Sequence, residues 1–244
     1  MIYAAILDTR RAQGLLPLRC RLDEYFLRRI EETKNIGLRN ERVAAYSLLT
    51  VLYEKLYGKP LPPIEIGEMG KPRLLGVNIG ISLSHTEGFA AAVINDGGEV
   101  GADIEAQMEK ERAERVGERF LKDISLAENE NFSLPIVLIS LTLTKDGELD
   151  GALLSALSAG TDKSFKSDEL HDGAVISAPC KDGDEKNLVL HKWTAAESVL
   201  KLNGYGFNDY KSLHIAQKNA KTYTYEISSH GEIWSFSVSA YAKG

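Results

Sequence analysis

The segment VGADIEA places the carboxylates of Asp103 and Glu105 two residues apart. On a strand both side chains project from one face, about 7 Å apart along it, because successive side chains alternate between faces. The two charges repel each other, so either water screens them or a cation lies between them. The same alternation marks any half-exposed antiparallel strand, and this spacing alone leaves both interpretations open.

A second charged pattern lies in WTAAESVLK, within a segment rich in good helix formers. Trp193, Glu197 and Lys201 follow each other at i, i+4 and i+8 and share one helical face. A glutamate and a lysine at this spacing more often form a solvated ion pair than a site. If Glu197 meets the two strand acids, the carboxylates form an oxygen-lined site suited to Mg²⁺, which takes carboxylate, water and phosphate oxygens.

Candidate phosphate-binding groups precede the strand acids in the chain. SLSHT supplies His85 between the hydroxyls of Ser84 and Thr86, and GKPRL supplies Lys71 before a proline that stiffens the backbone. Singly, such a histidine and such a lysine are more often structural. Together they predict a compact cationic pocket with hydroxyl groups for phosphate.

The composition narrows the classes of protein to consider. The 244 residues are 43% hydrophobic and 26% charged, as in a soluble globular protein. A formal net charge of −6 argues against a broad nucleic-acid-binding surface. The N-terminus lacks signal-peptide features, and the most apolar stretch, residues 132–144, is too short and interrupted to span a bilayer. With two isolated cysteines, we expect a cytoplasmic protein without nucleic-acid or membrane partners.

Hydrophobic periodicity in the first half of the chain predicts a mixture of helices and antiparallel strands. Two helices are expected within residues 23–57, with a break at Gly37 and a stop at Gly58. The Pro-rich connector that follows has room for one short strand. Strands are expected at residues 2–7, in a hairpin over 78–96 with its turn at Glu87–Gly88, and at 100–106 as the third strand of that sheet.

The second half begins with a charged amphipathic helix over residues 109–123. Residues 123–190 are expected to be an irregular insertion with some strand content. A helix over 191–203, closed by Gly204, precedes three strands at 211–217, 221–229 and 232–242. The prediction is therefore an α+β fold with two similar halves, residues 1–98 and 99–244, each a helix and a small sheet.

Four segments, GKPRL, ISLSHTEGFAAAVI, VGADIEA and WTAAESVLK, resemble in order and context the signature motifs of the 4′-phosphopantetheinyl transferases of the surfactin-synthetase-activating type. That family's patterns are G-K-P, S-H-S, G-x-D-x-E and W-x-x-K-E-S-x-x-K. The resemblance spans about residues 42–201. It implies a pseudo-dimer of two α/β halves with the active site in the cleft between them.

The resemblance also implies roles for single residues. Mg²⁺ would bind three acidic residues and grip the pyrophosphate of coenzyme A, and the nucleotide and phosphates would contact basic and hydroxyl residues. The implied metal ligands are Asp103, Glu105 and Glu197, and the implied coenzyme A contacts are Arg42, Lys71, Ser84, His85 and Lys201.

The activity implied is transfer of 4′-phosphopantetheine from coenzyme A to a serine of an acyl- or peptidyl-carrier protein, with release of 3′,5′-adenosine bisphosphate. Mg²⁺ would neutralise the pyrophosphate, and Glu197 would accept the serine proton directly or through water. Lys71 and Lys201 would hold the phosphates in line. We expect the protein to act as a monomer.

The chain departs from the family pattern in three places. Ala196 stands where the family has lysine, and Lys192, one turn earlier, is a hypothetical substitute. SHT replaces SHS, which keeps the hydroxyl. The insertion at about 123–190 is longer than the family pattern and would be either an added lobe or a tolerated surface loop.

Two other interpretations stay open. The missing lysine at Ala196 also fits a homologue that binds coenzyme A or a carrier protein but has lost catalysis. The other is that the chain is an unrelated α+β protein whose acidic residues face solvent. That interpretation requires all four motifs to occur by coincidence.

Overall fold

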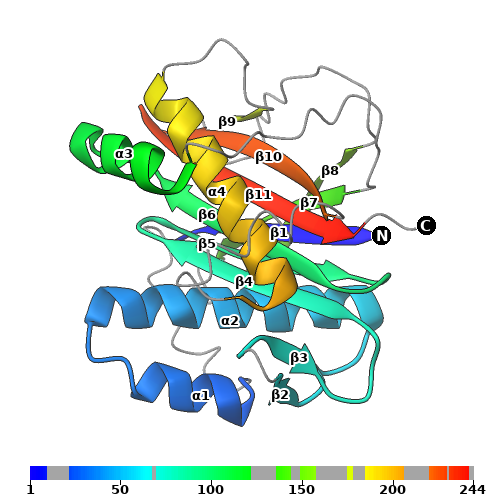
Figure 1. Cartoon of the computed structure of the whole chain (residues 1–244). Coiled ribbons are helices and arrows are strands. Elements are labelled where there is room, and N and C mark those ends of the chain that lie inside the picture. The colour runs from blue at the N-terminus through cyan, green and yellow to red at the C-terminus, as the bar shows by residue number, and fades with distance from the viewer. Residues whose placement is uncertain are drawn as a thin grey trace.

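The computed structural model describes residues 1–9, 22–67, 70–121, 136–143, 149–157, 175–177, 185–205, 220–229 and 231–241. It is an α+β structure, as predicted from the sequence. Two β-sheets pack face to face (Figure 1). Helix α2 (Ile36–Tyr57) covers the outer face of the first sheet, and helix α4 (Glu185–Asn203) covers that of the second.

The first sheet has the strand order β4-β5-β1-β7-β8. Its strands are β1 (Ile2–Asp8), β4 (Gly80–Thr86), β5 (Phe89–Asn95), β7 (Ile136–Leu143) and β8 (Leu149–Leu157). All neighbours are antiparallel except β1 and β7. The predicted hairpin is confirmed, and its turn uses Gly88 at φ 89°. The predicted insertion thus supplies two strands to the sheet formed by the first half of the chain.

Two helices precede the hairpin, α1 (Glu24–Glu31) and α2 (Ile36–Tyr57). The prediction that Gly37 breaks the helical segment is wrong. Asn35 caps α2, its side chain accepting a hydrogen bond from the amide of Leu38, and Gly37 lies in the first turn. The stop at Gly58 is confirmed, because that residue adopts the left-handed conformation, φ 63°, that ends α2.

The second sheet has the order β6-β11-β10-β9. Its strands are β6 (Val100–Ala106), β9 (Val175–Ser177), β10 (Ala220–Ser229) and β11 (Glu232–Tyr241). The prediction that β6 is the third strand of the hairpin's sheet is wrong, because β6 pairs with β11 instead. The predicted strand at 211–217 lies outside the described residues.

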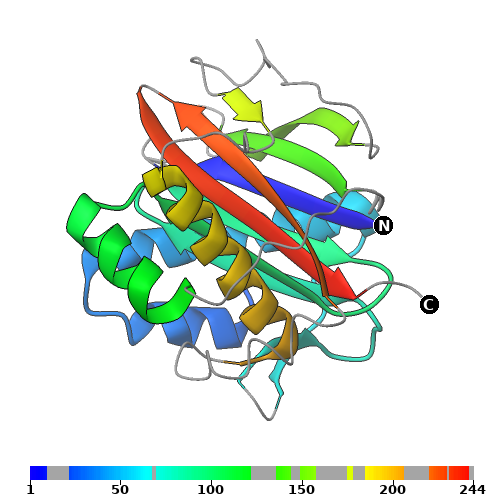
Figure 2. The same cartoon turned by 45° about the horizontal axis from the view of Figure 1, so that its top comes forward.

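Two short strands and two further helical segments complete the described chain. The Pro-rich connector holds β2 (Ile64–Ile66) and β3 (Pro72–Leu74), one strand more than predicted. The charged helix is α3 (Lys110–Val116), continued by a π-helical turn, η3 (Gly117–Leu121). The last helix, α4 (Glu185–Asn203), crosses β6 and β11 and contacts α3 (Figure 2). No described helix is long and apolar enough to cross a bilayer.

Alternate side chains of the strands form separate cores on the two sides of the first sheet. Ala5, Ala92 and Ile94 face α2, where they pack with residues such as Leu48 and Leu52. The positions that alternate with these on the same strands face the second sheet. They belong to the core between the two sheets, which includes Ile2, Ala4, Ile6, Ala91, Val93, Val100, Ala102, Ile104, Trp234, Phe236 and Val238. This period of two is what a strand buried on both faces requires.

The edges of the two sheets are joined by hydroxyl groups. From Ser82 onward, every second residue of β4 carries a hydroxyl that accepts a hydrogen bond from a β6 amide. The amide of Ala102 donates to Ser82 at 2.9 Å, that of Ile104 to Ser84 at 3.2 Å and that of Ala106 to Thr86 at 3.4 Å. The edge amides of β6 are thereby satisfied without a paired strand. This hydroxyl ladder fixes the position of β4 along β6.

Gly101 allows α4 to lie directly on β6. A Cβ atom at this position would be 2.0 Å from the carbonyl oxygen of Ser198 and 2.3 Å from the amide nitrogen of Leu202. The glycine of the strand motif is therefore needed for the close approach of helix and strand. Because of that approach, the side chains of β6 and α4 converge.

Candidate active site

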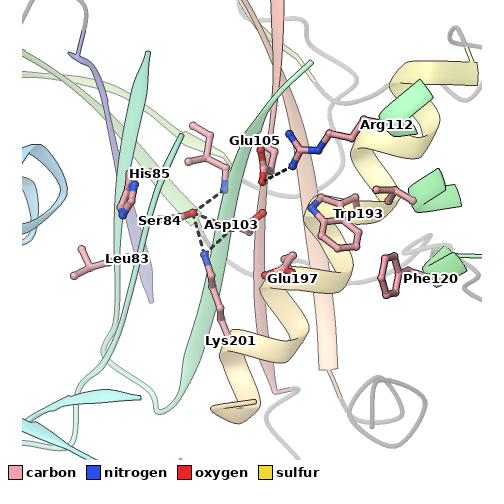
Figure 3. Close-up of a pocket in the computed structure, with 12 residues that line it drawn as sticks. Leu83, Ser84, His85, Asp103, Glu105, Arg112, Phe120, Trp193, Glu197 and Lys201 are labelled. Carbon is pink, nitrogen blue, oxygen red and sulfur yellow. Dashed lines mark hydrogen bonds and ion pairs between the residues drawn. The ribbon is translucent and has the colours of Figure 1, made fainter. Parts of the chain in front are cut away.

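One pocket of about 500 Å³ collects side chains from four parts of the chain (Figure 3). β4 and β6 form one side, and α4, α3 and η3 form the other. Its lining residues are Leu83, Ser84, His85, Asp103, Ile104, Glu105, Arg112, Val116, Phe120, Trp193, Glu197 and Lys201. The predicted helical face at i, i+4 and i+8 is confirmed, since all three of its residues line this pocket.

Asp103 is bound by neighbours from two elements. The ammonium group of Lys201 donates a hydrogen bond to Asp103 Oδ1 at 2.6 Å, and the hydroxyl of Ser84 donates to the same oxygen at 2.9 Å. Lys201 also donates to Ser84 Oγ at 3.0 Å. Strand β4, strand β6 and helix α4 are therefore linked by one polar cluster at the pocket.

The second oxygen of this carboxylate, Asp103 Oδ2, is buried and has no hydrogen-bond partner among the described residues. The residue as a whole is only 5% exposed. A buried carboxylate oxygen without a donor is costly, and a bound ion or water is a common reason for its presence. This oxygen is one observation in favour of a cation in the pocket.

The environment of the other two carboxylates favours their protonated forms. Burial and the negative charge of Asp103 raise the pKa of Glu197 to about 7, against the opposing charge of Lys201. Burial and Asp103 also raise the pKa of Glu105, which Arg112 and Lys201 oppose. The three acids therefore interact electrically across one pocket, and added positive charge would relieve their repulsion.

Within the described part of the chain, no three histidine, cysteine, aspartate or glutamate side chains are arranged to hold one metal ion. Asp103, Glu105 and Glu197 share the pocket, but Lys201 lies on Asp103. The donor set still fits Mg²⁺, which is usually held by one or two carboxylates with water and phosphate oxygens. The buried Oδ2 atom of Asp103, which has no hydrogen-bond partner in the part of the chain that the structure describes, supports that fit.

His85 lies at the pocket with a carboxylate behind it. Its Nδ1 atom is 3.0 Å from an oxygen of Glu41, on α2, and burial lowers the pKa of the imidazole against the opposing effect of Glu41. The charges of Lys201 and Arg42 lower this pKa further. Glu41 was not found from the sequence, although it immediately precedes the predicted Arg42.

Arg42 does not line the pocket in the structure. Its guanidinium donates to the carbonyl oxygen of Arg29 at 3.3 Å and to the hydroxyl of Thr33, so it connects α2 to the end of α1. Its positive charge lowers the pKa of His85, which does line the pocket. Its predicted contact with coenzyme A remains a prediction.

Lys71 also lies outside the pocket lining. Its ammonium group donates at 2.9 Å to the carbonyl oxygens of both Val100 and Leu202 and forms an ion pair with Glu99 at 2.6 Å. The side chain is 9% exposed, and three acceptors use all three of its donors. In this structure Lys71 links the end of α4 to the start of β6 through these hydrogen bonds. Its predicted contact with phosphate remains a prediction.

The structure places the two α4 positions discussed for the missing lysine away from the pocket lining. Ala196 is 4% exposed and packs in the core between α4 and α3. Lys192 does not line the pocket either. Arg112, on α3, does line it, and was missed because the sequence shows only that α3 is charged, not which face meets the site.

An aromatic wall closes the side of the pocket opposite the strands. Phe120 and Trp193 are in ring contact, with centroids 5.6 Å apart, and Val116 lies beside them. The pocket therefore combines one charged side and one apolar side. No protein-family model and no curated protein sequence matches the chain.

Proposed function

We propose that the protein is a Mg²⁺-dependent 4′-phosphopantetheinyl transferase, which moves phosphopantetheine from coenzyme A to a serine of an acyl- or peptidyl-carrier protein. The observation that carries the proposal is the meeting of Asp103, Glu105, Glu197 and Lys201 in one pocket with His85. These residues come from three motifs that are far apart in the sequence. In an unrelated protein nothing would require them to share a site.

The order of the strands supports the proposal of a pseudo-dimer. In one set, β1 pairs with β5 and β5 with β4, while α2 covers the outer face. In the other, β6 pairs with β11 and β11 with β10, while α4 lies on the outer face. Each set follows the same sequence of strand, helix, strand, strand, and the pocket lies where β4 of one meets β6 of the other.

Glu197 is the proposed proton acceptor. Without a bound metal, burial and Asp103 raise the pKa of Glu197 to about 7, which makes its carboxylate a better base than an exposed glutamate. Bound Mg²⁺ would lower this pKa and keep Glu197 ionised and able to accept a proton at neutral pH. The serine hydroxyl of the carrier loses its proton to Glu197 as its oxygen bonds to the β-phosphorus of coenzyme A. The bond from that phosphorus to the bridging oxygen breaks, and 3′,5′-adenosine bisphosphate leaves.

Other residues position the phosphates. Lys201 supplies a cation to the pocket lining, where it donates hydrogen bonds to Asp103 and Ser84. Mg²⁺ would be held by one or two of the carboxylates of Asp103, Glu105 and Glu197, together with water and phosphate oxygens, and it would offset the charge of the pyrophosphate. The proposed reaction does not specify the carrier protein, which contacts at the protein surface would select.

The test is mass spectrometry of apo acyl- and peptidyl-carrier proteins after incubation with the protein, coenzyme A and Mg²⁺. We expect the carrier to gain one phosphopantetheine group, and chelation of Mg²⁺ to stop the gain. Glu197→Gln should lower the rate by about 10²-fold or more, because it removes the proton acceptor. Glu65→Gln, an exposed change on β2, is the matched control and should match the unchanged protein.

A second candidate is a homologue that binds coenzyme A or a carrier protein without catalysis. The lack of a lysine at Ala196, and the burial of that position, favour it. Binding of coenzyme A by calorimetry, with no modification of any of several carriers, would replace the first proposal by this one.

A further inference from the structure

Among the described residues that line the pocket, three are carboxylates, and two, Lys201 and Arg112, are basic side chains other than His85. Phosphate groups carry negative charge, so a pocket that binds them needs positive charge that is not already committed to its own acids. The two cations differ in how firmly the structure engages them.

Lys201 is strongly engaged. Its ammonium lies 2.6 Å from Asp103 and 3.0 Å from Ser84, and the side chain is 31% exposed. Because Asp103 is buried, removing its cationic partner, the one ion pair it forms among the described residues, would be costly. Lys201 therefore balances charge within the protein before any ligand arrives.

Arg112 is held loosely by comparison. Its ion-pair partner among the described residues is Glu105, at 3.7 Å, and its side chain is 52% exposed. A guanidinium has five N–H donors in a planar fork, so one long ion pair leaves most of them available. It reaches the pocket from α3, on the side away from β4 and His85 (Figure 3).

We infer that Arg112 binds a phosphate group of the ligand in this pocket and supplies the positive charge that α4 lacks at Ala196. Neither Ala196 nor Lys192 lines the pocket, whereas Arg112 does, so the charge comes from a different element. The inference rests on the proposed function, and it names a binding residue for the same site. Phosphate oxygens would replace Glu105 as the partner of the guanidinium, in the bidentate geometry that arginine favours.

Two measurements test this inference in the 244-residue chain. The first is calorimetric binding of inorganic pyrophosphate with Mg²⁺, which requires no transfer activity. The second is the kinetics of carrier modification. Arg112→Met should weaken pyrophosphate binding and raise the KM for coenzyme A by about 10-fold to 100-fold, with the KM for the carrier unchanged. Arg112→Lys should recover part of the loss.

Two control variants keep the test specific. Arg115→Met removes an exposed arginine from the same helix that does not line this pocket, and Lys192→Met removes the alternative cation on α4. Both should bind pyrophosphate as the unchanged protein does. A loss in Lys192→Met with none in Arg112→Met would overturn the inference.

A third comparison separates phosphate binding from simple neutralisation of Glu105. If Arg112 binds phosphate, Arg112→Met weakens pyrophosphate binding in a Glu105→Gln background as well. If it only balances Glu105, the effect disappears in that background and the inference is wrong. Absence of transfer by the unchanged protein would instead count against the proposed function, while pyrophosphate binding would still report on Arg112.

Discussion

The position of Glu197 in the fold raises the pKa of its side chain. Its helix face was predictable from spacing, but its pKa of about 7 arises because the fold buries it beside Asp103. A carboxylate with this pKa is suited to accept a proton near neutral pH. It also makes the stability of the protein depend on pH.

We predict that the penalty for burying Glu197 grows as the pH rises. Below about pH 4.5 the group is protonated in both the folded and unfolded states. Between 4.5 and about 7 the unfolded state loses the proton first, so folding stability falls as pH rises. The penalty is complete above about pH 7.

Glu197→Gln removes this titration. Its free energy of unfolding, measured in urea without divalent cations, should exceed that of the unchanged protein by on the order of 2 kcal/mol at pH 8. The difference should shrink at pH 5. A difference that does not vary between the two pH values would contradict the assigned shift.

At the scale of elements, the contact between α4 and β6 determines where the site's acids and lysine meet. Gly101 makes that contact possible, since a Cβ there would overlap the backbone at Ser198. The sequence marked Gly101 only as part of a motif. The reason for a glycine there became visible with α4 in place.

Gly101→Ala should therefore lower the free energy of unfolding by about 3 kcal/mol, because backbone atoms cannot move aside as a side chain can. Gly117→Ala is the control. Its added methyl group would make an ordinary 3.6 Å contact with Val189, in a helical conformation that alanine favours. Chemical denaturation measures both, and equal effects would contradict the close contact.

Lys71 fastens the same two elements at their ends, where it joins Val100 to Leu202. We predict that Lys71→Met lowers the free energy of unfolding by about 2 kcal/mol, since two carbonyl oxygens lose this donor and Glu99 keeps only its ion pair with Arg73 among the described residues. Lys59→Met, an exposed change, should have little effect. If Lys71→Met instead leaves stability intact and weakens coenzyme A binding, the residue contacts the ligand.

The whole molecule depends on how its two sheets meet. The apolar faces of the two sheets pack against each other. Hydrophobic contact is non-directional, so it does not by itself select the register of one sheet relative to the other. The hydroxyl ladder from β4 to β6 supplies that register, and it places Ser84 against Asp103. The pocket lies along this junction.

Ser82→Ala tests the ladder away from the site. It leaves the buried amide of Ala102 without its partner, and we expect a loss of about 1 to 3 kcal/mol in the free energy of unfolding. Ser47→Ala is a matched control, because the Ser47 hydroxyl is buried on α2 with no hydrogen-bond partner among the described residues. Thermal or urea unfolding should therefore show Ser47→Ala neutral or stabilising, and a loss equal to that of Ser82→Ala would argue against the ladder.

The amino-acid sequence alone determined the α+β class, the hairpin, the charged helix and the shared face of Trp193, Glu197 and Lys201. These follow from local periodicity and turn chemistry, which act over a few residues. Local rules failed where two competing signals were close together. Gly37 suggested a break in the helical segment, but Asn35, two residues earlier, is the N-cap residue of α2. The helix therefore begins before Gly37 and continues through it.

Only the tertiary structure decided which sheet receives β6, where the ammonium of Lys71 binds and which face of α3 meets the pocket. Each depends on segments more than 20 residues apart, such as the pairing of Val100–Ala106 with Glu232–Tyr241. A strand's pattern shows that it has a buried face but not which partner covers that face. The long-range contacts that settle this arise when the whole chain packs, and they place Arg112 beside the acids that the sequence had already marked.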